Sequence, residues 1–373
     1  MKLTKLSLVA TLAISATFAG GTVEPVATKV VKAPVVKTEA CNSNTTINGN
    51  AKLYYYTNDS VDLFDEASSA ASAAVTIDVS HKIFEGVTAN FTVLGFTDLG
   101  DSMGELKMEG EETGAFFNVA NITASYAGTT LVAGRQLLDT PMLGSFDWLL
   151  APSGFEAYTL VNTSINNLTL VGSYVNKLRA NNSGDEFVEL EGDNYAFGAS
   201  YSDKISASLW YYNVDAANYT QVYVDAGYEY SSVKAQVQFA STDYDDNGED
   251  STAFGVKLSG SFANINLSAA YASISDRETG YVEVDSIYTS SWNIFASGYV
   301  TDSFKVEAGT EYNSFSATVS YADYDTANEL DVILAYAVTD CFSLDAIYTS
   351  TEYDTTSNDD AEGALELIAT YKF

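Results

Sequence analysis

The side chains of this chain that could carry chemistry are mostly carboxylates. Asp and Glu number 50 against 17 Lys and Arg, the formal net charge is −33, and His81 is the only histidine. Clustered carboxylates can bind Ca²⁺ or Mg²⁺ or concentrate cations around an opening, although solvated loops are the simpler interpretation. The charge argues against a nucleic-acid partner, because such a partner needs a basic surface.

The same inventory gives little support for catalysis. His81 falls at the end of a predicted strand, whereas a histidine-dependent hydrolase needs its histidine at the site of chemistry. No carboxylates at a fixed spacing suggest another reaction. We therefore predict that the chain is not an enzyme and has no catalytic residue, no metal site and no cofactor, unless its acidic loops hold Ca²⁺ or Mg²⁺.

The chain has two cysteines, Cys41 and Cys341. Cys41 directly precedes the first predicted strand, and Cys341 lies in a short connection near the end of the chain. In a closed barrel the first and last strands meet, so both thiols would lie at one rim, and the periplasm permits disulfides. A Cys41–Cys341 bond and two free thiols both remain open.

The elements that would position these side chains are segments of alternating apolar and polar residues. In residues 233–239 (VKAQVQF) every second residue is apolar, and the pattern recurs, for example in residues 315–321. Successive side chains of a strand point to opposite faces, so one face could meet lipid and the other a wet lumen. The charged residues that we assign to the lumen wall are Lys52, Asp78, Lys177, Asp225, Glu229, Lys234, Lys257, Glu307 and Glu311.

The connections between these segments alternate in length. Short ones, such as residues 127–129 and 231–232, separate longer acidic ones, such as residues 97–114 and 241–250. Outer-membrane barrels have short periplasmic turns and long extracellular loops. The sequence therefore predicts an all-β transmembrane antiparallel β-barrel of about 18 strands, with about 16 as the alternative.

Two regions leave details of this barrel open. Residues 274–302 could form one long loop or a loop plus a hairpin. Residues 115–136 alternate poorly, so the face of the barrel that Arg135 occupies stays undecided.

The start of the chain has the features of a secretory signal peptide, which we assign to residues 1–19. Two lysines precede an apolar run, and a small-x-small cleavage site ends at Ala19. No later apolar run reaches the roughly 18 residues of a helical membrane span. We expect residues 20–43 to be a periplasmic tail and residues 44–373 to be the barrel, located in the bacterial outer membrane.

Residues 137–152 break the alternation. A strand ends at Gln136 and another resumes at Phe155, and the stretch between them is apolar and carries Pro141 and Pro152. It falls where the third long connection is expected. We interpret it as an inward-folded third extracellular loop whose apolar side chains pack against the inner wall.

The sequence resembles the porins of epsilonproteobacteria of the major-outer-membrane-protein type, which are related to the specific-channel porins of pseudomonads. The resemblance is carried by GRQLLDTPMLG at residues 134–144, SGFEAYTLVN at residues 153–162 and LTLVGSYVNKLR at residues 168–179. It implies an 18-stranded barrel, usually a homotrimer, whose third loop narrows the pore. On this resemblance the residues expected near the constriction are Arg135, Asp139, Asp147 and Glu156.

The ending of the chain, at Phe373, is similar to the C-terminal signal that outer-membrane barrels present to their assembly machinery. Some relatives line the pore with a ladder of basic residues for carboxylate substrates, but the lysines here are scattered. We therefore predict an outer-membrane porin for passive diffusion of small hydrophilic solutes and ions, with a cation preference, surrounded by outer-membrane lipid and lipopolysaccharide. The alternatives are a substrate-specific channel of the same fold and a non-conducting structural or adhesin barrel.

Overall fold

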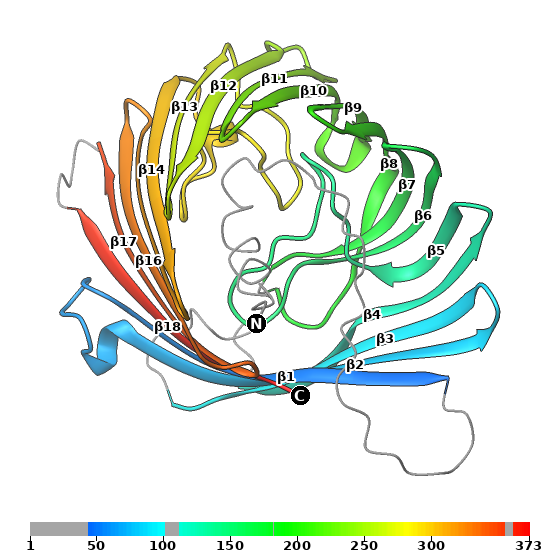
Figure 1. Ribbon diagram of the computed structural model, residues 1–373, viewed down its shortest axis with the longest axis horizontal. Coiled ribbons are helices and arrows are strands. Elements are labelled where there is room, and N and C mark those ends of the chain that lie inside the picture. The colour runs from blue at the N-terminus through cyan, green and yellow to red at the C-terminus, as the bar shows by residue number, and fades with distance from the viewer. Residues whose placement is uncertain (1–43, 101–111, 182, 355–360) are drawn as a thin grey trace.

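The computed structural model describes residues 44–100, 112–181, 183–354 and 361–373. In these residues 18 antiparallel strands form one sheet that closes into a barrel, because β1 pairs with both β2 and β18 (Figure 1). The first nine strands are β1 (Thr45–Asn58), β2 (Ser69–Phe84), β3 (Val87–Asp98), β4 (Thr113–Tyr126), β5 (Thr129–Gln136), β6 (Gly154–Ile165), β7 (Leu168–Arg179), β8 (Val188–Ser202) and β9 (Ile205–Val214). The other nine are β10 (Tyr219–Tyr230), β11 (Val233–Tyr244), β12 (Ser251–Phe262), β13 (Ile265–Ser275), β14 (Asp302–Tyr312), β15 (Phe315–Asp323), β16 (Ala327–Thr339), β17 (Phe342–Tyr353) and β18 (Glu362–Lys372).

The alternation of residue types follows the two faces of this wall. In β2, Val75 and Ile77 are 44% and 37% exposed, whereas Ala70 and Ala74 on the other face are buried. In this strand large apolar side chains therefore face outward, where a bilayer would cover them, and alanine side chains face the interior. The predicted all-β transmembrane barrel is confirmed.

The turns at one end of the barrel are short. Residues 166–167 and 231–232 each join two strands directly, and Asn167 and Ser231 have φ angles of 62° and 59°. Two-residue hairpin turns need such left-handed residues, because their twist then matches that of the strands. At the other end the connections are mostly longer, so the predicted alternation in length is confirmed.

Residues 276–301 form a single connection between β13 and β14 and contain only one short helical turn, η3 (Ala296–Gly298). The connection adds no hairpin to the wall, so the prediction of 18 strands holds and the alternative of 16 is excluded. The other short helices in the described residues are η1 (Glu66–Ser68) and η2 (Asp215–Ala217). Within the described ranges, no helix has the length and apolar character needed to span a membrane.

A β-bulge explains why β4 alternates poorly. The pairing of β3 with β4 shifts between Thr92 and Val93, so that Asn118 is an extra residue in β4. An extra residue inverts the phase of the alternation on one side of it, which hides the strand from a period-two pattern.

The barrel closes through the last residue of the chain. The Phe373 N–H donates to the Gly49 carbonyl over 3.0 Å, and the Gly49 N–H donates back over 2.9 Å. A β-carbon on Gly49 would lie 2.7 Å from the Phe373 ring and 2.5 Å from the Thr76 carbonyl oxygen. The closure therefore depends on a glycine at this position.

Two connections lie inside the ring of strands in Figure 1: residues 137–153, between β5 and β6, and residues 276–301, between β13 and β14. Their buried side chains belong to the two apolar clusters of the described structure. The interior of the barrel is therefore partly filled by chain.

Candidate functional site

Residues 137–153 fold into two small loops that serine side chains close. The Ser145 N–H donates to the Leu138 carbonyl over 2.7 Å, and the Leu138 N–H donates to Ser145 Oγ over 3.0 Å. In the same way the Ser153 N–H donates to the Phe146 carbonyl over 2.9 Å, and the Phe146 N–H donates to Ser153 Oγ over 2.7 Å. Side chains thus satisfy backbone groups of a segment that belongs to no strand of the wall.

Polar contacts attach this segment to three distant strands. The Met142 N–H donates to the Tyr212 hydroxyl of β9 over 3.3 Å. Lys52 Nζ of β1 donates to the Leu149 carbonyl over 2.9 Å, and Trp148 Nε1 donates to Glu366 Oε1 of β18 over 3.3 Å. Since β9 and β18 lie on opposite sides of β5 in the strand order, the segment links walls that are not neighbours.

Apolar packing supports the same attachment. Leu138, Met142 and Leu143 belong to one cluster with wall residues of β6 and β9, including Phe155, Trp210 and Tyr212. Leu149, Leu150 and Ala151 belong to a second cluster with wall residues of β1 to β4, including Tyr54, Leu94, Phe96 and Phe116. Burial of apolar side chains is the main stabilising contribution to such packing.

The second interior connection, residues 276–301, pairs with the first. The Val282 N–H donates to the Met142 carbonyl over 2.9 Å, and the Gly144 N–H donates to the Val282 carbonyl over 3.2 Å. Asp285 is buried and accepts hydrogen bonds from the Ile287 N–H, Ser290 Oγ and the Ser297 N–H. Burial raises the pKa of the Asp285 carboxyl group, and its three donors fix the fold of this connection.

Asp139 and Asp147 are the acidic residues of the first segment, and both are exposed to solvent. The surrounding protein still removes part of the hydration of Asp139, and this burial raises the pKa of its carboxyl group. Two exposed carboxyl groups therefore place negative charge on this interior segment.

Arg135 and Glu156 lie elsewhere. The residues next to them in the strands are buried: Gln136, Phe155 and Ala157. Phe155 and Ala157 belong to the apolar cluster that also contains Leu138. Because side chains alternate along a strand, Arg135 and Glu156 occupy the opposite, outer face. This placement differs from the expectation that all four predicted side chains meet at one constriction.

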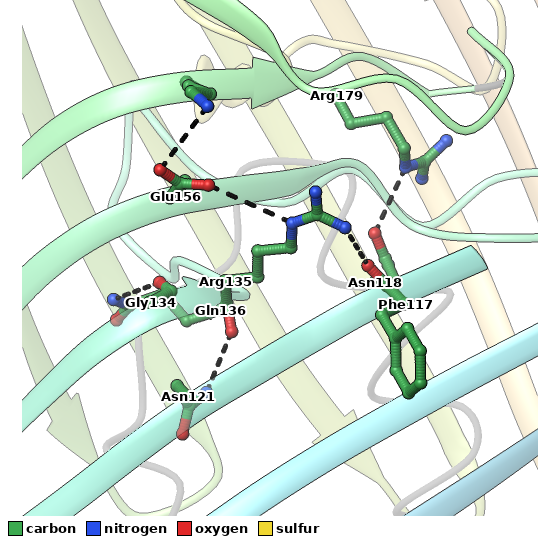
Figure 2. A network of polar contacts seen from close by, with 9 residues as sticks. Phe117, Asn118, Asn121, Gly134, Arg135, Gln136, Glu156 and Arg179 are labelled. Atoms are coloured by element: carbon green, nitrogen blue, oxygen red, sulfur yellow. Dashed lines mark hydrogen bonds and ion pairs between the residues drawn. The ribbon is translucent and has the colours of Figure 1, made fainter.

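On that outer face three charged residues form a ladder across β5, β6 and β7. Arg135 Nε lies 4.0 Å from Glu156 Oε2, and Lys177 Nζ lies 3.7 Å from Glu156 Oε1. Arg135 also donates from Nη1 to the Phe117 carbonyl over 3.0 Å (Figure 2) and stacks on the Phe187 ring at 4.1 Å. Lys177 is predicted on the lumen wall, but it lies on the outer face. A register shift before it in β7 places it beside Glu156.

The other charged residues assigned to the lumen wall occupy those alternate strand positions whose side chains point to the interior, as nearby buried residues show. Gln221 and Tyr223 are buried in β10, and Ser303 and Lys305 are buried in β14. The same alternation in β1, β2, β10, β11, β12 and β14 places on the inner face Lys52, Asp78, Asp225, Glu229, Lys234, Lys257, Glu307 and Glu311. Glu229, Lys234, Lys257 and Glu307 surround a polar cavity of about 390 Å³ on this face.

Several residues at this site escaped the sequence analysis. Glu366 of β18 accepts hydrogen bonds from Trp148 and Trp292, one from each interior connection, and from the Tyr54 hydroxyl. Alternation in β18 assigns this carboxylate to the inner face, and both tryptophans lie outside strands. Its partners could not be identified without the fold.

Arg179 and Asn181 form a second anchor at the end of β7. Arg179 is fully buried, donates from Nη2 to the Pro152 carbonyl and donates from Nε to Asn118 Oδ1 over 3.1 Å (Figure 2). Asn181 Nδ2 lies 3.0 Å from the carbonyl oxygens of Phe146, Trp148 and Ala151. These donors satisfy carbonyl groups of the interior segment.

The remaining candidates lie away from this site. His81 is exposed near the short-turn end of β2, where the Thr45 hydroxyl lies 2.8 Å from its Nδ1 atom. Cys341 is exposed in the turn between β16 and β17, whereas Cys41 lies outside the described residues, so the disulfide stays a prediction. In the described ranges no group of three His, Cys, Asp or Glu residues could hold a metal ion, and most acidic residues of the loop around 101–111 fall outside those ranges.

Comparison with solved structures places the fold among bacterial channels. The vanillate-bound Pseudomonas aeruginosa OpdK is 14% identical, with a TM-score of 0.76, 88% of this chain covered and 98% of that chain covered. Pseudomonas aeruginosa OpdQ is 17% identical with a TM-score of 0.73 (88% and 99% covered), and Acinetobacter baumannii OccAB4 is 15% identical with a TM-score of 0.75 (89% and 98% covered). A search of curated proteins finds no match.

A family profile covers most of the barrel. The profile described as "outer membrane porin, OprD family" matches residues 101–340. This range contains both interior connections and most of the wall. The chain belongs to the OprD family of porins and is a β-barrel of the bacterial outer membrane.

Proposed function

We propose that the barrel passes small hydrophilic solutes and ions by passive diffusion, with a preference for cations. On this proposal residues 137–152 are the inward-folded third extracellular loop and form the constriction. The observation that carries it is the attachment of this segment to β1, β9 and β18, which leaves Asp139 and Asp147 exposed. A porin of this kind needs no cofactor and catalyses no reaction.

Charge supports the cation preference. The inner wall carries acids and lysines together, whereas the net charge of the whole chain is −33. Carboxylates near a narrow passage raise the local concentration of cations and repel anions, an effect that salt weakens. Because Arg135 and Lys177 lie on the outer face, they do not offset Asp139 and Asp147 in the passage.

A substrate-specific channel of the same fold is the second candidate. The similar OpdK structure contains vanillate, and an aromatic cavity between the two interior connections of this chain offers a place for a preferred solute. Strong block of the current by one solute would favour this candidate.

We also propose the setting of the barrel. It would be a homotrimer of the epsilonproteobacterial type, in contact with outer-membrane lipid and lipopolysaccharide, inserted by the assembly machinery through Phe373. Residues 1–19 would be removed on export and residues 20–43 would remain as a periplasmic tail. The acidic loops could bind Ca²⁺ or Mg²⁺.

Planar-bilayer recording tests the function. Purified protein should give stepwise conductance, and the reversal potential in a KCl gradient should have the sign of a cation-preferring pore. A reversal potential of the opposite sign would refute the preference. No conductance from correctly folded protein would favour a structural or adhesin barrel.

A further inference from the structure

The two interior connections enclose a cavity lined mainly by aromatic rings. Its volume is about 350 Å³, within the usual size range of small-molecule sites. Six rings line it, two from residues 137–153 and four from residues 276–301: Phe146, Trp148, Tyr281, Trp292, Phe295 and Tyr299. Each of these side chains is partly exposed, so the rings remain accessible from the interior.

The rings hold one another in place. Phe295 packs edge-on against Phe146 at 5.2 Å and against Tyr281 at 5.5 Å between ring centres. Phe146 and Phe295 belong to different connections, so these contacts fix the width of the cavity. Edge-to-face packing of this kind is a favourable aromatic geometry and gives a preformed site.

The electrostatics of the cavity favour a positively charged occupant. The aromatic face carries negative charge density, and tryptophan binds cations best. Trp148 and Trp292 both donate their Nε1–H groups to Glu366, and donation to a carboxylate polarises each indole toward a more negative ring. None of the described residues that line the cavity is basic, and Lys52 Nζ donates to the Leu149 carbonyl instead.

The amide and indole N–H groups of Asn293, Trp148 and Trp292 at the cavity are already used. The Asn293 N–H donates to Glu329 Oε1 over 2.8 Å, and Asn293 Nδ2 donates to Thr349 Oγ1 over 3.0 Å. Both indole N–H groups are also engaged. Apart from the hydroxyl groups of Tyr281 and Tyr299, the cavity therefore offers ring faces, which suit a weakly hydrated cation.

We propose that this cavity binds small organic cations, of the quaternary ammonium or alkylammonium class, through cation–π contacts. The proposal deepens the cation-preferring pore proposed above and rests on it for the route by which such solutes reach the cavity. The organic cation would bind at the rings for a time before it continues through the pore.

The test compares choline with its neutral isostere 3,3-dimethyl-1-butanol, which has carbon in place of the charged nitrogen. Binding to the full-length protein in detergent is followed by tryptophan fluorescence, because two of the three tryptophans line the cavity and Trp210 is buried in β9. Block of the KCl current in planar bilayers is the second readout. Choline should bind at least about tenfold more tightly than the isostere.

Variants locate the site. Phe295→Leu should weaken choline binding by about two- to thirtyfold, the range for one cation–π contact, whereas Phe295→Tyr keeps a ring and should retain binding. The matched control is Phe304→Leu, because Phe304 is exposed on the outer face of β14. Glu366→Gln keeps an acceptor for an indole N–H but removes the charge, and should weaken choline binding more than isostere binding.

Each outcome supports or refutes the cavity proposal or the pore proposal. Equal binding of choline and the isostere would show an apolar site and overturn the proposal, and so would choline binding that Phe295→Leu leaves unchanged. A conducting, cation-preferring pore without a choline effect would refute the cavity proposal alone. Choline binding in detergent by a protein without cation preference would refute the pore proposal and keep the cavity.

Discussion

Trp148 and Trp292 donate to the same carboxylate oxygen, Glu366 Oε1, over 3.3 and 2.9 Å. The two tryptophans come from different interior connections, and Glu366 belongs to the strand that closes the barrel against β1. One wall residue thus holds both connections at their aromatic ends.

Removal of Asn181 should loosen the interior segment. Its side-chain amide lies 3.0 Å from three carbonyl oxygens of that segment, and a buried acceptor left without a donor costs about 1–3 kcal/mol. Asn181→Ala should increase current noise and mean conductance in single-channel records. Asn264→Ala, in a short turn at the far end of the barrel, is the control, and equal noise in both variants would contradict the prediction.

Deletion of residues 137–152 should raise the conductance without preventing barrel formation. Gln136 pairs with Phe155, so Ser153 and Gly154 would remain as a two-residue turn between β5 and β6. Single-channel step size and heat-modifiable gel mobility check the two parts of this prediction. An unchanged step size from a folded barrel would reject the constriction.

Cation preference should fall with decreasing pH. Burial raises the pKa of Asp139, so this carboxyl group is protonated, and loses its negative charge, at a higher pH than an ordinary aspartate with a pKa of about 3.9. Reversal potentials in a KCl gradient over a pH series measure the effect. Asp139→Asn should lower the cation preference at neutral pH and make the reversal potential depend less on pH in the upper part of the series. Asp245→Asn, in an exposed loop, should match the wild type.

For the charged residues on the outer face, Arg135, Glu156 and Lys177, we predict no effect on ion selectivity. Glu156→Gln removes the negative charge that pairs with Arg135 and Lys177, and partly exposed ion pairs contribute about 0–1 kcal/mol. We expect a small loss of thermal stability and an unchanged reversal potential. Asp147→Asn should shift the reversal potential, so a larger shift from Glu156→Gln would show that Glu156 faces the passage after all.

Gly49 should be required for closure. A β-carbon there meets the Phe373 ring and the Thr76 carbonyl, so Gly49→Ala should reduce the yield of folded barrel in heat-modifiable gel mobility. Gly95→Ala in β3 is the matched control, because the nearest atoms, in Gly114 and Ala115, lie 3.9 and 4.0 Å from the added carbon. A normal yield for Gly49→Ala would contradict the proposed fit of the last residue.

The strands could be predicted because their pattern is local. Residues 233–239 alternate strictly, and their side chains divide between the two faces as expected. Arg135 could not be assigned, because the eight residues of β5 show no clear alternation of apolar and polar residues. The junction of Trp148, Trp292 and Glu366 depends on the position of residues far apart in the sequence, and no periodicity contains that information.

The attachment of residues 137–153 to β9 on one side and to β1 and β18 on the other has a mechanical meaning. An empty ring of strands can be squeezed into an ellipse at little cost, because each strand pair only tilts. Here such flattening would shorten or stretch the span between those walls and break hydrogen bonds at both ends. The segment proposed to form the constriction would therefore also resist flattening of the barrel under the lateral pressure of the membrane.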